Sequence, residues 1–161
     1  MTVQMTSQWL DLSLRDIFTR YHATDARYRH LAFSSKDFAV LPELATAITH
    51  CLPDYKVWDG NQPTAHAPPG TGSRFDFIQQ TFSQPTGLII VQPDYWFRHW
   101  SGLDEQAFWS ALSTREGCHP VVVVFAQNHG FSQQNNHYFL PQELHGTAIT
   151  LWVSSKVPLS S

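Results

Sequence analysis

The residues that could do chemistry are densest in one stretch, from Gln92 to Glu105. This stretch combines aromatic side chains with carboxylates, of which Asp104 and Glu105 stand next to each other. Aromatic faces can stack on a nicotinamide or adenine ring, and a carboxylate beside apolar rings can stabilise a positively charged transition state. Ser101 and Asp104 also resemble a capping box, because acidic residues suit the positive start of a helix. We expect a cap at Asp104 and leave a catalytic and a structural role open for Glu105.

The usual nucleotide and metal signatures are missing. The turn at 33–37 reads Phe-Ser-Ser-Lys-Asp, whereas a P-loop needs GxxxxGK[ST] so that backbone amides can cradle phosphate. A Gly-Thr-Gly run at 70–72 is a partial match to an anion site at a helix start, although such runs are more commonly plain loops. The sequence has no GxSxG elbow and no HExxH pair. His129 and His137 flank a Gln/Asn-rich loop, a weak metal signal, and we expect neither a metal nor a resident cofactor.

Composition narrows the class of protein. The 161 residues are 42% apolar, 14% aromatic and 14% charged, with a formal net charge of -3. This composition indicates one folded domain and excludes a disordered tail, and the charge balance argues against a nucleic-acid binder. Cys51 and Cys118 show no zinc spacing. Because no signal peptide and no apolar run of roughly 20 residues is present, we expect a cytoplasmic protein that does not span a membrane.

The elements that must position these residues alternate along the chain. An amphipathic helix is expected at 7–21, with its apolar stripe packed on its own domain or on another chain. Strands are expected at 28–33, 55–59, 87–91, 120–126 and 147–154, and helices at 38–52, 73–83 and 101–114. The run of valines from Val121 to Val124 indicates a strand buried on both faces in the middle of a parallel sheet.

This order predicts an α/β fold, a three-layer sandwich with a central five-stranded parallel sheet of flavodoxin-like type. We divide the chain into an N-terminal helical extension at 1–27, an α/β domain at 28–154 and a loose tail at 155–161. In such sheets, ligands bind at the carboxyl ends of the strands. Attention therefore falls on the segments 34–37, 59–72, 92–100 and 127–136.

Five short stretches resemble a TIR (Toll/interleukin-1 receptor) domain of the bacterial type, and the resemblance covers residues 28–153. The first strand and turn, Leu-Ala-Phe-Ser-Ser-Lys-Asp at 31–37, look like those of the family, and so does Lys-Val-Trp-Asp at 56–59. Pro-Pro-Gly at 68–70 stands where the family has its BB loop. The third strand with its continuation to Trp100, and Leu-Pro at 140–141, also fit the family pattern.

The resemblance implies an enzyme that cleaves NAD at the nicotinamide–ribose bond, as a hydrolase or an ADP-ribose cyclase, in bacterial immune signalling. The family's essential glutamate stands four residues after the tryptophan, where this chain has Asp104, with Glu105 one position further. Either carboxylate would be catalytic. The resemblance also implies aromatic walls and strand-end groups that bind the substrate, namely Phe33, Ser34, Ser35, Trp58, Asp59 and Trp100. NAD would be a substrate and not a cofactor, and the implied partner is a second copy or another TIR or sensor protein.

Two other functions fit the same residues. One is a TIR-like interaction module without catalysis, which the shifted position of the glutamate favours. The other is a degenerate P-loop-type ATPase or accessory subunit, with residues 89–94 as an altered Walker B strand. The missing GK[ST] counts against ATP hydrolysis.

Overall fold

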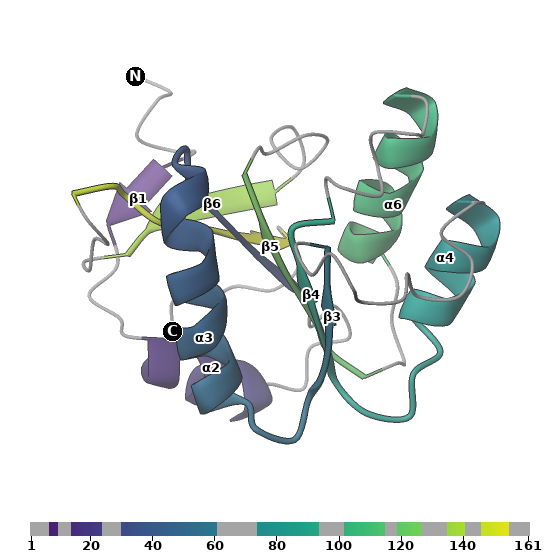
Figure 1. Cartoon of the computed structure of the whole chain (residues 1–161), viewed down its shortest axis with the longest axis horizontal. Coiled ribbons are helices and arrows are strands. Elements are labelled where there is room, and N and C mark those ends of the chain that lie inside the picture. The colour runs from purple at the N-terminus through teal and green to yellow at the C-terminus, as the bar shows by residue number, and fades with distance from the viewer. Residues whose placement is uncertain are drawn as a thin grey trace.

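The computed structural model describes residues 7–9, 14–23, 30–60, 74–93, 102–114, 119–126, 135–140 and 146–154. Strands and helices alternate through the middle of the chain (Figure 1). The strands are β1 (Ser7–Trp9), β2 (Leu31–Ser34), β3 (Lys56–Asp59), β4 (Leu88–Val91), β5 (Val121–Phe125), β6 (Asn135–Phe139) and β7 (Thr150–Ser154). The helices are α2 (Leu14–Ala23), the short 3-10 helix η1 (Phe38–Val40), α3 (Leu41–Cys51), α4 (Arg74–Thr81) and α6 (Gly102–Thr114).

The strands form a single seven-stranded sheet in the order β1-β6-β7-β2-β5-β4-β3. Strands β2, β5, β4 and β3 are mutually parallel. Strand β7 runs antiparallel to both β2 and β6, and β1 pairs parallel with β6. The sheet is therefore mixed: among the described strands, β7 runs opposite to the other six, and β2, β5, β4 and β3 form its parallel half.

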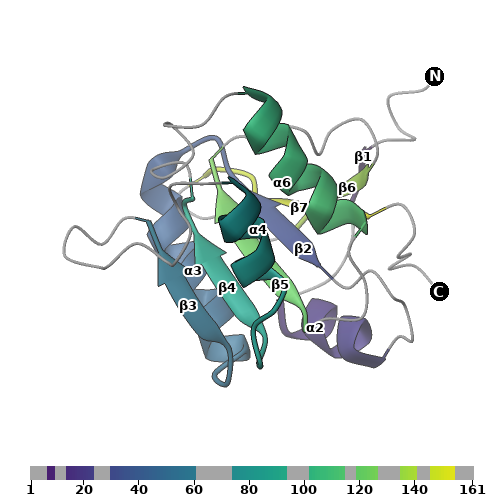
Figure 2. The same ribbon diagram turned by 90° about the vertical axis from the view of Figure 1, so that its right-hand side faces the viewer.

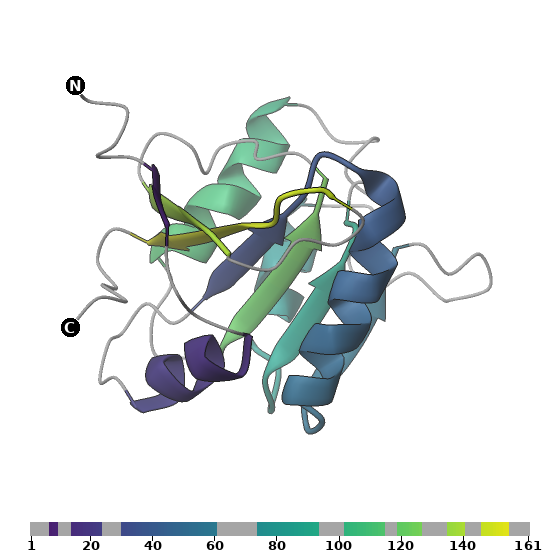
Figure 3. The ribbon, with the colours of Figure 1, turned by 90° about the vertical axis from the view of Figure 1, so that its left-hand side faces the viewer.

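Helices cover both faces of the sheet. Helices α2 and α3 lie on one face (Figure 3), and α4 and α6 lie on the other (Figure 2). The strand side chains alternate between the two core clusters: Val122 and Val124 of β5 belong to the first, and Val121, Val123 and Phe125 to the second. We call these the α3 face and the α6 face. The predicted three-layer arrangement, with helices on both faces of a central sheet, is confirmed. This layering is consistent with a flavodoxin-like layout.

Four of the five expected strands are parallel, as predicted, but the expectation that the sheet is all-parallel and has five strands is wrong. The strand expected at 147–154 is present as β7, but it is antiparallel, and β1 and β6 add two strands. Alternating hydrophobicity reports which face a strand buries and carries no information on its direction. Strand β1 has three residues, and the β6 sequence Asn-Asn-His-Tyr-Phe begins with polar residues, so neither gives a strand signal.

The order of the parallel strands also differs from that of flavodoxin. There the first strand lies between the second and the third, whereas here β2 is next to β5, and β3 is at the edge. The chain crosses from β2 to β3 through α3 on one face and returns through β4 to β5 by way of α4 and α6 on the other. The return connections run along the sheet in the opposite direction and lie on the opposite face. These two changes cancel, so all three crossovers have the same handedness, as parallel βαβ units require.

The N-terminal helix packs on its own domain. Helix α2 begins at Leu14, so the expected helix at 7–21 was placed too early, and residues 7–9 form β1. Ile17 and Phe18 are buried in the α3-face cluster, and the Phe18 and Phe33 ring centroids are 6.0 Å apart. Among the described residues, no helix is long and apolar enough to cross a membrane.

A buried histidine connects the beginnings of two parallel strands. His30, which precedes β2, is 3% exposed, and its Nδ1 accepts a hydrogen bond from the backbone N–H of Val121 at 2.9 Å. Its ring also packs edge-on against Phe82, with centroids 5.0 Å apart. An acceptor at this position therefore satisfies the first amide of β5 in the core.

We predict that His30→Ala lowers the free energy of unfolding by about 1–3 kcal/mol, because it leaves a buried amide unsatisfied. His119→Ala removes an exposed imidazole next to the same strand and should change stability by less than about 0.5 kcal/mol. Urea unfolding followed by circular dichroism measures both. Equal stability of the two variants would contradict a structural role for His30.

Candidate functional site

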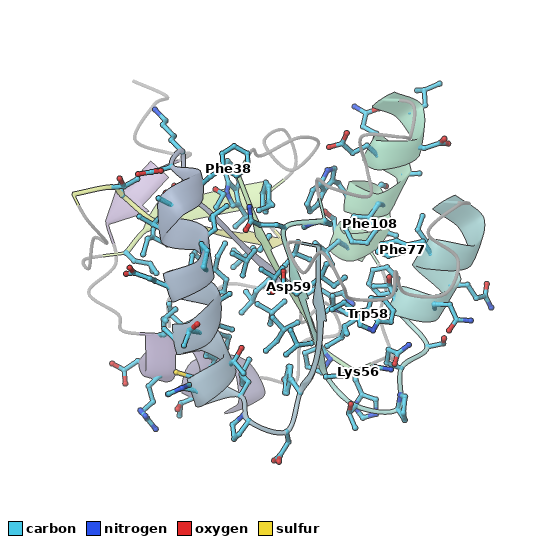
Figure 4. All side chains as sticks on the ribbon, in the orientation of Figure 1. Phe38, Lys56, Trp58, Asp59, Phe77 and Phe108 are labelled. Atoms are coloured by element: carbon cyan, nitrogen blue, oxygen red, sulfur yellow. The ribbon has the colours of Figure 1, made fainter. Side chains whose placement is uncertain are left out.

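The candidate site is the edge of the sheet where the parallel strands end. We call it the carboxyl edge and define it by the described residues that follow these strands. They are Ser35–Asp37 after β2, Gly60 after β3, Gln92 and Pro93 after β4, and Ala126 after β5. Helices α3 and α6 follow β2 and β4 along the chain, and both begin at this edge (Figure 1). Figure 4 shows Lys56 and Asp59 at opposite ends of β3, with Phe38 toward the Asp59 end.

The predicted aromatic walls do not meet. Phe33 is fully buried on the α3 face, where it contacts Phe18. Trp58 is 8% exposed and lies on the α6 face, with its ring centroid 5.9 Å from that of Phe77. The sheet separates the two side chains, and each is part of a core cluster. Trp100, the third predicted aromatic, lies outside the described residues.

Ser34 takes part in a structural hydrogen bond. The buried indole Nε1 of Trp152 donates to Ser34 Oγ at 2.8 Å, and this bond joins β2 to the antiparallel strand β7. The serine predicted to bind substrate therefore satisfies a buried donor of the core. The sequence offers no signal for this pairing, because the partners are 118 residues apart.

The turn after β2 binds its own helix start. Asp37 Oδ1 accepts from the Ala39 N–H at 2.9 Å, and the Asp37 carbonyl accepts from the Val40 N–H at 3.2 Å. The Asp37 N–H in turn donates to Ser35 Oγ at 3.4 Å. A helix start attracts anions through its free amides and its dipole. Here a carboxylate of the chain already occupies this position.

The two candidate catalytic carboxylates lie in the first turn of α6. Asp104 and Glu105 are both half-buried there, which fits the expected preference for acids at a helix start. Helix α6 packs on the face opposite Phe33. Asp59, half-buried at the end of the edge strand β3, pairs in register with Val91, whose side chain belongs to the α3-face cluster. The predicted acidic and aromatic residues are thus distributed over both faces.

Gln92 is the residue of this edge that the predicted site left out. Its side chain is 5% exposed, and within the described residues Oε1 has no hydrogen-bond partner. Its φ of 47° lies in the left-handed region, where residues other than glycine are uncommon. A polar residue directly after the buried run Leu-Ile-Ile-Val was the available sequence signal.

Gly60 allows the backbone to close around Gln92. Its N–H donates to the Val91 carbonyl at 2.8 Å, and a Cβ built on it would lie 2.2 Å from the Gln92 carbonyl oxygen. On the other side, the Gln92 N–H donates to the Val124 carbonyl at 2.7 Å. Neighbouring strands therefore fix the backbone of Gln92 from both sides.

Several predicted features fall outside the described residues: the loop at 68–70, the Gly-Thr-Gly run at 70–72 and His129. His137 lies in β6. In the part of the chain that the structure describes, no group of His, Cys, Asp and Glu side chains is arranged to hold a metal ion.

A scan against protein-family models and searches of curated proteins and of solved structures found no match for this chain. The TIR resemblance therefore stays a prediction.

We predict that Gly60→Ala destabilises the fold by about 1–3 kcal/mol or more, because the new methyl group would overlap the backbone of Gln92. Gly102→Ala is the matched control, since a Cβ there meets nothing within 4 Å. Thermal and urea unfolding of both variants measure the difference. A Gly60→Ala protein as stable as the wild type would show that the close approach of Gly60 and Gln92 is absent in solution.

Ser34→Ala should lower the free energy of unfolding by about 1–3 kcal/mol, because the buried Trp152 N–H loses its acceptor. Ser110→Ala, at an exposed position of α6, should have an effect below about 0.5 kcal/mol. The indole N–H resonance of Trp152 should also shift in the Ser34 variant. An unchanged resonance and unchanged stability would free Ser34 for a binding role.

Proposed function

We propose that this chain is a non-catalytic accessory protein built on the sheet topology of the P-loop ATPases. The observation that carries the proposal is the strand order. In a large class of P-loop ATPases, the first parallel strand lies next to the fourth, with the third and then the second beyond it. Strands β2, β5, β4 and β3 follow this order. This likeness concerns the fold alone, and the residues at the carboxyl edge determine the chemistry.

The residues at the carboxyl edge support a module that does not hydrolyse nucleotide. The turn after β2 has no glycine, and Lys36 is exposed there. A P-loop instead places its lysine and free amides around the phosphates. Asp37 occupies the amides at the helix start with a negative charge, which disfavours a phosphate at the same place. The P-loop analogy therefore extends to the order of the strands and not to the phosphate-binding turn.

The end of β4 supports the same conclusion. In a Walker B strand, an acidic residue follows the buried apolar run and helps to hold the magnesium ion. Here the neutral amide of Gln92 directly follows β4. A neutral amide has no negative charge to attract a magnesium ion, and it is too weak a base to accept a proton from water. The partner we propose is therefore another protein, or a second copy of this chain.

A TIR-like enzyme that cleaves NAD is the second candidate. It is favoured by the half-buried carboxylates of Asp104 and Glu105, which begin α6 at the carboxyl edge. The position of β2 beside β5, and the separation of Phe33 from Trp58, count against it. A flavodoxin-like order is what the TIR resemblance implies.

Turnover of ATP and of NAD by the purified protein at high concentration tests both candidates. We predict no turnover of either, in the wild type and in the Glu105→Gln and Asp104→Asn variants. NAD turnover that is lost in Glu105→Gln or Asp104→Asn but kept in Glu43→Gln, an exposed first-turn acid of α3, would establish the NAD-cleaving enzyme. Magnesium-dependent ATP turnover would contradict the non-catalytic function directly.

A further inference from the structure

The side-chain amide of Gln92 is buried at the carboxyl edge. Gln92 is 5% exposed, yet its Oε1 has no hydrogen-bond partner in the described part of the structure. Buried side-chain oxygens in folded proteins are nearly always paired, so an unpaired one needs an explanation. A glutamine amide presents an acceptor and a donor next to each other.

The backbone of Gln92 is held in an unfavourable conformation. A φ of 47° is disfavoured for a residue with a Cβ, and the hydrogen bond to Val124 and the contact with Gly60 maintain it. Strained residues of this kind persist where the surrounding structure determines them, and they cluster at ligand sites. Gln92 also follows an interior strand of the parallel half, at the edge where open α/β sheets bind ligands.

The charges of this edge favour an uncharged ligand. Among the described residues at or beside this edge, the acidic Asp37, Asp59, Asp104 and Glu105 outnumber the basic Lys36. Asp37 also fills the helix start that a phosphate would use. A phosphate at this helix start would meet repulsion from the Asp37 carboxylate, which an uncharged ligand avoids.

We propose that Gln92 anchors a binding site for an uncharged small molecule that donates an N–H to Oε1. A matching ligand edge has a donor beside an acceptor, and this chemistry occurs in the adenine ring of a nucleoside and in a primary carboxamide. Glutamine amides pair with adenine through its amino group and ring nitrogen in this way. The site is independent of the proposed accessory function, because binding of either compound requires no turnover.

Thermal unfolding with millimolar adenosine or benzamide tests the site. The wild type and Gln79→Met, which changes an exposed glutamine of α4, should be stabilised by at least one of the two compounds. Gln92→Met has a similar size and no amide, so it should lose the response. Without ligand, Gln92→Met should unfold about 2–4 °C higher than the wild type, because an unpaired buried acceptor is removed.

The two compounds distinguish the sources of the ligand chemistry. A response to adenosine alone assigns a purine, a response to benzamide alone assigns a carboxamide, and a response to both assigns the shared edge. ATP should give a smaller shift than adenosine because the Asp37 carboxylate repels its phosphates. Should Gln92→Met fail to fold, Gln92→Gly replaces it, since glycine accepts the positive φ and also removes the amide.

Three results would overturn the site. The first is the absence of a shift with both compounds, the second is an equal shift in the Gln92 variants, and the third is an ATP shift larger than that of adenosine. Turnover of ATP or NAD would contradict the proposed accessory function and would leave this test unaffected.

Discussion

The pairing of β5 between β2 and β4 is the interaction on which the rest of the structure depends. All five residues of β5 are buried, and they alternate between the two core clusters. A strand that is apolar on both sides has to be covered on both sides, so helices are required on each face of the sheet. Parallel neighbours in turn require crossover connections, and these bring the strand ends and the starts of α3 and α6 to one edge.

Local hydrogen bonds then determine what this edge can do. Trp152 pairs with Ser34, and Asp37 caps the helix that follows β2, so two polar residues at the carboxyl end of β2 already serve the fold. The same packing leaves Gln92 buried with an unpaired oxygen. Among the described residues of this edge, the chain therefore satisfies the polar groups of Ser34 and Asp37 itself and leaves Gln92 Oε1 unpaired. The proposed Gln92 site rests on the unpaired oxygen, and the proposed accessory function rests on the strand order together with the occupied helix start.

Much of the parallel half could be predicted from the sequence. The valine run of β5, the alternation of strands with helices and the proline-started α3 have strong local signals, and the elements lie within a few residues of their expected positions. Strand direction, strand order and the short strands β1 and β6 are set by contacts distant in the sequence, which periodicity does not encode. The candidate site was less predictable for the same reason. Phe33 and Trp58 looked equivalent as strand aromatics, and only the register places them on opposite faces.

The strand order is the central claim, and backbone NOEs in an isotope-labelled sample test it most directly. The account predicts cross-strand NOEs between β2 and β5, for example from Ala32 to Val123, and none between β2 and β3. NOEs that join residues 31–34 to residues 56–59 would contradict it. They would place the first two parallel strands side by side, as in a flavodoxin-like sheet, and would return support to the NAD-cleaving function.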